Sequence, residues 1–396
     1  MSKPSISVTS VGVVTALGVG ADGLFRGLLA GQRAICPVAG FGVEGCRATL
    51  SAEVSCALPS DCDSRTAALS VVALSDALKG LPGLGDLRRV GLVFGSAGAG
   101  TAVLEGHLAG DVTAAALLKH YTKRRVVDEL SMRFGLAGPL HAINTACSSG
   151  AVAVSIAVDW LQYGECDVAI ALAADELGRF TFTGFHALRA MDPEPCRPFD
   201  RNRRGLTMGE GAGCLILERS DDAKRRGCTN HGYVRSVGLA CDAHHLTAPD
   251  PEGIGPARAL TRAIESGGIQ PEDVGFINAH GTGTQLNDAA EVASIERALS
   301  THAPRCPIHS VKSSIGHCMG AAGAIEAVVT LCSLEQQLVP PTAGLLDCEF
   351  SDRVTCVKDY PMRVQADYAL SNSFGFGGND AAILFAHSRT AGNAHP

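Results

Sequence analysis

The sequence lacks the features of a secreted or membrane-anchored protein. None of its 15 cysteines forms a Cys-x-x-Cys pair, and neither an Asn-x-Ser/Thr sequon nor a signal peptide is present. Apolar runs have the length of buried strands or helices and are far shorter than a membrane span. The cysteines are odd in number and scattered, which favours free thiols in the reducing cytoplasm.

Positive charge is also scarce. The formal net charge is −7 and the charged residues make up 18% of the chain. A nucleic-acid partner is therefore not expected, because phosphate binding needs a basic field. Metal is not expected either, since the pairs at 244–245, 306/309 and 317–318 have no second ligand pair at zinc spacing.

The chain is long, apolar and rich in glycine. Its 396 residues exceed what one hydrophobic core usually serves, so we expect two domains or two fused halves. Three short patterns occur twice in the same order, which predicts a duplicated α/β unit with halves at 1–230 and 231–396. The paired stretches are 90–98 with 274–282, 145–151 with 312–324, and 211–217 with 377–385. Two such halves would place their strand-to-helix turns around one cleft.

Cys147 stands in the most informative stretch. An apolar lead-in is followed by a turn of small residues, 145–150 (Thr-Ala-Cys-Ser-Ser-Gly), and then by a buried helix. At a helix N-terminus the free N–H groups and the macrodipole favour a thiolate, so Cys147 is a candidate nucleophile. The alternative is a small, inert buried side chain among 15 cysteines.

Two histidines occupy comparable turns in the second half. His280 lies in Ala-His-Gly-Thr-Gly-Thr directly after a predicted strand, and His317 lies in Lys-Ser-Ser-Ile-Gly-His just before a predicted helix. A lone histidine is more often a satisfied polar residue than a catalyst. Histidines flanked by glycine and threonine at strand ends are better candidates.

These motifs, together with Asn-Ser-Phe-Gly-Phe-Gly-Gly-Asn at 372–379, resemble in order the four signatures of the β-ketoacyl-acyl carrier protein synthases. This is the elongating, condensing branch of the thiolase superfamily, and the resemblance extends over about residues 5–386. It implies an α/β, thiolase-like fold in which two duplicated halves form a five-layered αβαβα core. The first half would carry the nucleophilic cysteine and the second the two histidines.

The resemblance also implies an acyltransferase reaction. Cys147 would take an acyl group from a carrier thioester. Malonyl-acyl carrier protein would lose CO2, and His280 and His317 would donate Nε2–H to the thioester oxygen of the resulting enolate. A Claisen condensation would follow, with the tetrahedral oxyanion held by the backbone N–H groups of Cys147 and Phe376.

Further roles follow from the same resemblance. Lys312 and Glu326 would organise the site, with the ammonium keeping the imidazoles neutral and the thiol ionised. Thr282 and Thr284 would hold the 4′-phosphopantetheine arm of the carrier, and no cofactor of the enzyme's own is implied. A gating loop would consist of Phe374, Gly375, Phe376, Gly377 and Gly378. The alternatives are threonines that serve the turn and a phenylalanine that serves the core.

Partners and pathway stay open. An acyl carrier protein is the implied substrate carrier, and the chain would form a homodimer or a heterodimer with a chain-length-factor-like subunit. Lys119, Lys123, Arg124 and Arg125 form either a docking patch for an acidic partner or a solvated helix face. The short 95–136 region leaves the acyl chain unassigned, so fatty acid, polyketide and aryl-polyene synthesis all remain open.

Three rival assignments fit the motifs less well. A thiolase needs a second cysteine in its C-terminal turn, where this chain has residues 372–378 without one. Initiating synthases have asparagine in place of His317. A non-catalytic chain-length factor lacks the reactive cysteine that stands here at 147.

Overall fold

The computed structural model describes residues 4–390, and its centre is a sheet whose strand order is the same in both halves. In the first half the order is β6 (Leu140–Ile143), β5 (Val90–Gly95), β7 (Val168–Asp175), β9 (Gly211–Arg219) and β1 (Ile6–Thr15). In the second it is β12 (Pro307–His309), β11 (Val274–Asn278), β16 (Tyr368–Gly375), β17 (Asn379–Ala386) and β10 (Tyr233–Cys241).

Strand directions repeat as well. The first three strands of each set are parallel, and the last two pair antiparallel to their neighbours. Each of the three sequence echoes falls on equivalent elements, which confirms the predicted duplication. A short antiparallel pairing, with Ile6 opposite Val234, joins the two sets. β14 (Thr355–Cys356) extends the second set beyond β12, and the short β2 (Gly18–Val19) pairs with β1, so that the sheet has 12 strands.

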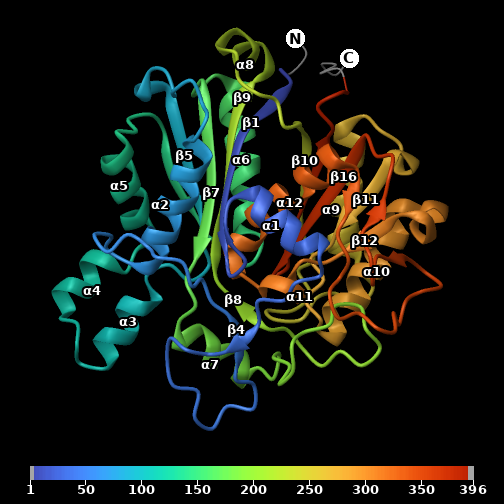
Figure 1. Cartoon of the computed structure of the whole chain (residues 1–396), viewed down its shortest axis with the longest axis horizontal. Helices are drawn as coiled ribbons and strands as arrows, with labels where there is room; N and C mark the ends of the chain where they lie inside the picture. The colour runs from blue at the N-terminus through green and yellow to red at the C-terminus, as the bar shows by residue number, and fades with distance from the viewer. Residues whose placement is uncertain (1–3, 391–396) are drawn as a thin grey trace.

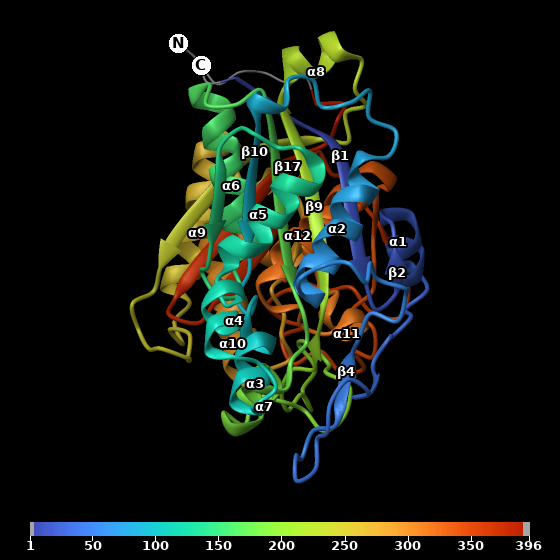
Figure 2. The same cartoon turned by 90° about the vertical axis from the view of Figure 1, so that its left-hand side faces the viewer.

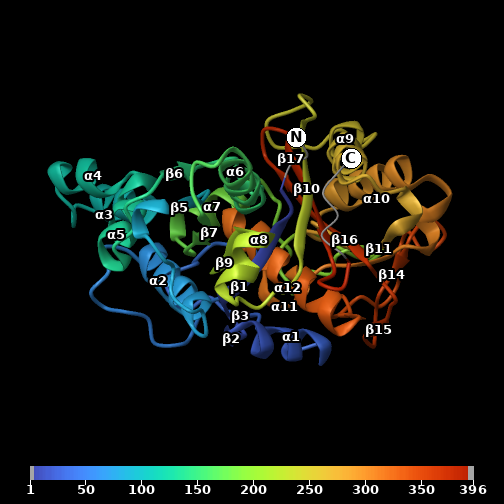
Figure 3. The same cartoon turned by 90° about the horizontal axis from the view of Figure 1, so that it is seen from above.

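Helices cover both sheet faces and fill the space between the two halves (Figures 1 and 3). The central layer consists of α6 (Ser149–Tyr163) and α12 (Ala322–Gln336), whose residues share one hydrophobic core with strands of both halves. Close packing there depends on Gly150, since a Cβ at this position would lie 2.6 Å from the backbone nitrogen of Ala324. The outer layers are α2 (Arg65–Leu78) with α5 (Lys123–Phe134), and α9 (Ile254–Gly267) with α10 (Gln285–Leu299). The result is the predicted five-layered, thiolase-like fold.

The predicted division between residues 230 and 231 stays a prediction. It falls between α8 (Ser220–Arg226) and β10, in the segment that connects the two repeated units. The shared central core means that neither unit buries its inner helix alone.

The remaining elements are short. Helices α3 (Thr101–Leu108) and α4 (Ala114–His120) lie below α5 on one side of the molecule (Figure 2). The other helices are α1 (Ala21–Leu29), α7 (Arg179–Ala187) and α11 (Lys312–Ile315), with 3-10 turns at Leu87–Arg89, Pro271–Asp273, Ser300–Arg305 and Met319–Ala321. The short strands are β2 (Gly18–Val19), β3 (Cys36–Pro37), β4 (Leu50–Ala52), β8 (Met208–Gly209), β13 (Leu338–Val339) and β15 (Met362–Arg363).

The small-residue loop after β5 is a tight structural turn. The buried carboxylate of Asp175 accepts hydrogen bonds from Ser96 Oγ and from the backbone N–H groups of Ala97 and Gly98. Gly100 has a φ of 90°, and a Cβ there would lie 2.0 Å from the carbonyl oxygen of Tyr121. The loop therefore packs against its own chain.

Within residues 4–390, no helix has both the length and the apolar character needed to cross a bilayer. The same residues contain no group of three or more His, Cys, Asp or Glu side chains arranged to hold a metal ion.

Candidate active site

Cys147 lies in the turn between β6 and α6, where the first half faces the second. The turn is sharp, because Ala146 has a φ of 52° and its carbonyl oxygen accepts a hydrogen bond from Ser149 Oγ at 2.6 Å. The helix itself begins at Ser149 with Ser148 as N-cap. Cys147 therefore precedes the first helical turn, although the sequence pattern places it at the helix N-terminus.

The electrostatics of Cys147 correct a second expectation. Burial raises the pKa of its thiol, whereas Lys312 and the backbone N–H of Phe376 lower it. The effect of burial is larger, and the resulting pKa is about 11. The free enzyme thus holds a protonated thiol, whereas the sequence argument expects a thiolate. Desolvation has the larger effect because Cys147 is only 7% exposed.

Both histidines reach the same point from the second half. The Nε2 atom of His317 lies 3.2 Å from Cys147 Sγ. The ring of His280 lies 5.3 Å from that of His317, centroid to centroid, at an interplanar angle of 84°. Burial, and then the nearby ammonium of Lys312, hold the pKa of both imidazoles well below its usual range. The predicted neutral histidines are supported.

Lys312 and Glu326 form an ion pair behind the histidines, and each side chain is 1% exposed. Lys312 Nζ also lies 3.4 Å from His280 Nδ1. An ammonium can only donate, so Nδ1 accepts and the ring proton of neutral His280 stands on Nε2, which faces the cleft. Burial raises the pKa of Glu326 to about 7 against the opposing effect of Lys312.

Thr282 and Thr284 follow His280 along the cleft wall, with 3.0 Å between their hydroxyl oxygens. Thr284 Oγ1 also accepts a hydrogen bond from the backbone N–H of Asn287, and so caps the N-terminus of α10. Thr284 therefore stabilises the start of α10, and both threonines line the cavity. The turn alternative and the substrate-binding hypothesis are compatible.

The predicted gating loop closes the opposite wall. Phe376 stacks on Phe185 of α7, with ring centroids 5.5 Å apart and planes inclined by 24°. Gly377 N–H donates to Leu246 of the neighbouring loop. Gly378 has a φ of 73°, and a Cβ there would lie 2.0 Å from Asp242 Oδ1. Phe374 packs beside His280, with 5.8 Å between ring centroids.

Asp380, just after this loop, is a buried carboxylate with an unusual environment. It is 4% exposed, and its Oδ2 atom has no hydrogen-bond partner in the described part of the chain. Burial, followed by the nearby Asp242 and Asp250, raises the pKa of Asp380 to about 8. The sequence gives no sign of this cluster, because Asp380 stands in β17 whereas Asp242 and Asp250 belong to the distant loop between β10 and α9.

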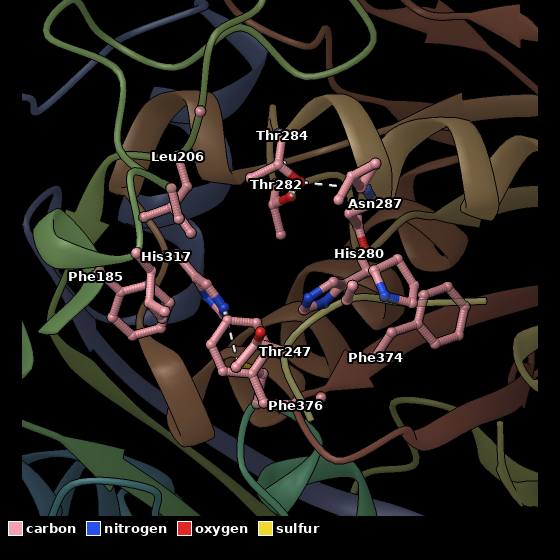
Figure 4. A pocket seen from close by; sticks show the side chains of 18 of the residues that line it. Phe185, Leu206, Thr247, His280, Thr282, Thr284, Asn287, His317, Phe374 and Phe376 are labelled. Carbon is pink, nitrogen blue, oxygen red and sulfur yellow. Dashed lines mark hydrogen bonds between the residues drawn. The ribbon is translucent and has the colours of Figure 1, made fainter. Parts of the chain in front are cut away.

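The side chains enclose one cavity of about 510 Å³ that opens to solvent. Figure 4 shows His280 and His317 pointing towards each other across it, Thr282 and Thr284 on one side and Phe376 on the other. Three exposed arginines, Arg47, Arg189 and Arg204, line the cavity together with the candidate catalytic residues. Among residues 4–390, Arg189 has no ion pair, whereas Arg204 pairs with Asp192 and Glu194.

Sequence analysis missed these arginines and also Glu291. The buried carboxylate of Glu291 accepts hydrogen bonds from the backbone N–H groups of His280 and Gly281, at 2.8 and 2.7 Å. It thereby fixes the turn that presents His280. The signal in the sequence was an acidic residue on the side of helix α10 that faces the protein interior. Only the folded structure shows which side of the helix is buried.

The basic segment at 119–125 lies on α4 and α5 and is not part of the cavity lining. Arg124 and Arg125 pair with Asp128 and Asp63. The docking hypothesis for this segment stays a prediction.

A thiolase-like fold with one cysteine and two histidines in a shared cleft defines the class of protein. Two family models match the chain: the β-ketoacyl synthase N-terminal domain over residues 67–223 and the β-ketoacyl synthase C-terminal domain over residues 231–346. The chain therefore belongs to the β-ketoacyl synthase family.

Curated relatives match along almost their whole length. Nodulation protein E of Rhizobium sp. strain N33 is 32% identical, covering 96% of this chain and 98% of its own. The 3-oxoacyl-(acyl-carrier-protein) synthase 2 of Vibrio cholerae serotype O1 is 33% identical, covering 97% and 99%.

Solved structures agree. A type II polyketide synthase acyl-carrier protein in complex with its ketosynthase, AntDE–AntF, matches with a TM-score of 0.91 and 25% identity over 97% of this chain and 99% of that one. The ishigamide ketosynthase/chain length factor matches with a TM-score of 0.88 and 29% identity over 97% and 99%.

Proposed function

We propose that this protein is a β-ketoacyl-acyl carrier protein synthase that condenses an acyl chain held on Cys147 with malonyl-acyl carrier protein. The observation that carries the proposal is the contact between Cys147 and His317, with neutral His280 across the same cavity. The family and the similarity to a 3-oxoacyl-(acyl-carrier-protein) synthase support it.

Acyl transfer begins from a neutral thiol. His317 Nε2 accepts the proton as Cys147 Sγ attacks the carbonyl carbon of the incoming thioester. The tetrahedral oxyanion then accepts hydrogen bonds from backbone N–H groups of Cys147 and Phe376. Its collapse releases the carrier thiolate, which takes the proton from His317. The products are acyl-Cys147 and the free carrier thiol.

Condensation uses the same groups in a different order. Malonyl thioester binds with its carbonyl oxygen between His280 and His317. Because His317 Nε2 was unprotonated when it accepted the thiol proton, its single ring proton shifts from Nδ1 to Nε2 before this step. Both neutral rings then donate Nε2–H to the negative charge that develops as CO2 leaves. The resulting carbanion attacks the acyl-Cys147 carbonyl, the C–S bond breaks, and the departing Cys147 thiolate takes a proton from solvent, which restores the neutral thiol. A dry, preorganised cavity strengthens these hydrogen bonds, and Lys312 keeps the rings neutral.

An acyl carrier protein is the proposed partner at the cavity mouth. Arg189 is exposed and unpaired in the described residues, and Arg47 and Arg204 stand on the same lining. A carrier with an acidic surface and a phosphate-linked arm would contact these guanidinium groups while its arm passes Thr282 and Thr284.

We further propose that the enzyme works as a pair of thiolase-fold chains. β6 ends the path of paired strands on the first side, so its outer edge is free in the described residues, and His141 on it is exposed. An edge of this kind can pair with a second chain. The second chain is either another copy or a chain-length-factor-like subunit, as in the ketosynthase/chain length factor structure.

The cytoplasm is the proposed compartment, because all 15 cysteines are free thiols. The substrate setting is fatty acid, polyketide or aryl-polyene synthesis.

The test is the intact mass of the protein after incubation with acyl-carrier thioesters of different length and unsaturation, with Cys147→Ala as matched control. We expect a covalent acyl adduct on the wild type only. The length and unsaturation of the preferred acyl group then indicate whether the pathway is fatty acid, polyketide or aryl-polyene synthesis. An adduct on Cys147→Ala would refute the nucleophile. If the wild type takes up no acyl group even with a candidate partner subunit, the condensing function fails.

A further inference from the structure

A close pair of cysteine sulfurs lies outside the active site. The Sγ atoms of Cys348 and Cys356 are 3.1 Å apart. No other contact between two cysteine sulfurs occurs in residues 4–390. Cys356 belongs to β14 at the edge of the sheet and is partly buried. Cys348 lies in the loop before it and is 8% exposed, and Leu346 in the same loop is 71% exposed.

We propose that Cys348 and Cys356 are a redox modification site that forms a reversible disulfide when the protein meets a peroxide. Neutral sulfurs without a bond normally stay farther apart than these two, and a shift of about 1 Å brings them to the 2.05 Å of a disulfide. Only eight positions separate them in the sequence, so the native loop already holds both ends together.

The two thiols differ in character. In the neutral pair Cys348 Sγ–H donates to Cys356 Sγ. When Cys348 ionises, Cys356 becomes the donor, so the contact lowers the pKa of Cys348 and raises that of Cys356. Cys348 is therefore the attacking sulfur. Its thiolate attacks one oxygen of hydrogen peroxide, the O–O bond breaks, and hydroxide leaves. Cys356 then attacks the resulting sulfenic acid, and its proton leaves with that hydroxyl as water. In total, two thiols and one peroxide give one disulfide and two waters.

The pair is joined to the active site through the loop that carries Cys348. The backbone of this loop pairs with the segment around Asp200, and Glu349 N–H donates to the Phe199 carbonyl oxygen at 3.0 Å. Glu349 also forms an ion pair with Arg203, which donates to the carbonyl oxygens of Thr284 and Gln285. Moving Cys348 towards Cys356 thus pulls on the support of the Thr284 turn. This second step rests on the proposed function.

Disulfide formation is tested in the full chain carrying Cys147→Ala, so that oxidation of the nucleophile does not contribute. After treatment with hydrogen peroxide at neutral pH we expect the loss of the mass of two hydrogen atoms, a cross-linked peptide joining residues 348 and 356, and reversal by a dithiol reductant. Cys348→Ser and Cys356→Ser should each abolish this change, whereas the exposed thiols in the matched controls Cys36→Ser and Cys241→Ser should leave it intact.

Persistence of the mass loss in Cys348→Ser, or a cross-link that maps to other cysteines, overturns the proposal. These readouts do not use condensation, so they stand apart from failure of the proposed function. The coupling is tested with wild-type enzyme in which a thiol assay shows that Cys147 is still reduced after oxidation. We expect oxidation to change the KM for the acyl carrier substrate by about two-fold or more, a size typical of coupling through contiguous contacts. Equal KM values before and after oxidation overturn the coupling.

Discussion

His317 Nε2 and Cys147 Sγ are 3.2 Å apart, and both groups are neutral at rest. Burial raises the pKa of the thiol to about 11 and, with the charge of Lys312, lowers that of the imidazole. An ion pair between them is thus disfavoured in the free enzyme. In the proposed mechanism the proton therefore moves from Cys147 to His317 as the sulfur attacks a bound thioester.

The first prediction concerns the reactivity of this thiol. Alkylation of Cys147 by iodoacetamide should accelerate as pH rises through 7 to 10, because the thiolate fraction grows until the pH reaches the pKa of about 11. The measurement is the modified fraction of Cys147 by peptide mass at each pH, with the exposed Cys36 as internal reference. A rate that is already constant below pH 7 would contradict the raised pKa.

Replacing each of the two histidines should affect different steps of the reaction. Of the two histidines, His317 is the one within hydrogen-bond distance of Cys147 Sγ, so His317→Ala should slow both acylation and malonyl decarboxylation. His280→Ala should leave acylation within a few fold of the wild type and slow decarboxylation by about 10²-fold, the size typical of losing one donor to a developing oxyanion. Acylation is followed by intact mass and decarboxylation by CO2 release. Equal losses in both steps for His280→Ala would refute this division.

Asp380 should make stability fall with rising pH. Its folded pKa of about 8 lies far above the value of about 3.9 for an unfolded aspartate, so between those values the folded chain binds more protons than the unfolded chain. That difference favours unfolding progressively as pH rises, until the pH passes 8. Asp380→Asn removes the ionisable group and should stabilise the protein by about 1–3 kcal/mol at pH 8.5, with a smaller gain at pH 5.

Denaturant unfolding at the two pH values measures this effect. The control is Asp111→Asn, which changes an exposed carboxylate and should show no such trend. A gain for Asp380→Asn that is the same at pH 5 and pH 8.5 would mean that the carboxyl group does not titrate as described.

Two basic surfaces compete for the carrier, and charge reversal separates them. Arg189→Glu should raise the KM for the acyl carrier substrate by about ten-fold, since rim charges act mainly on association, and this increase should shrink with salt. The matched pair Lys123→Glu with Arg124→Glu tests the helix surface in the same assay. If only the latter raises KM, the carrier docks on α4 and α5 and the cavity-mouth assignment is wrong.

Much of the site could be predicted from the sequence, because the groups that do the chemistry stand in short motifs at the ends of strands. Cys147, His280 and His317 meet as expected, since a repeated unit brings equivalent turns to one seam. Glu291, Arg189 and Asp380 could not be found in this way. Each lies near the site through loop paths and helix faces that local patterns do not encode.

The pKa of Cys147 shows a different limit. Sequence identifies a helix start and a nearby lysine, and both argue for a thiolate. It does not give the burial of the sulfur, which is the larger effect here. The Cys348–Cys356 contact has the same origin, since the seven residues between them permit many separations and only the folded loop selects one.

The matching strand order of the two halves says something about ancestry. A half-length chain that associated with its own copy would already have had two strand-to-helix turns facing each other across the symmetry axis. In the present chain the copies differ at those turns, since one carries the sulfur and the other carries the imidazoles and the ammonium beside them. The cleft of this enzyme therefore lies where two subunits would meet in such a pair, although a single polypeptide now crosses it.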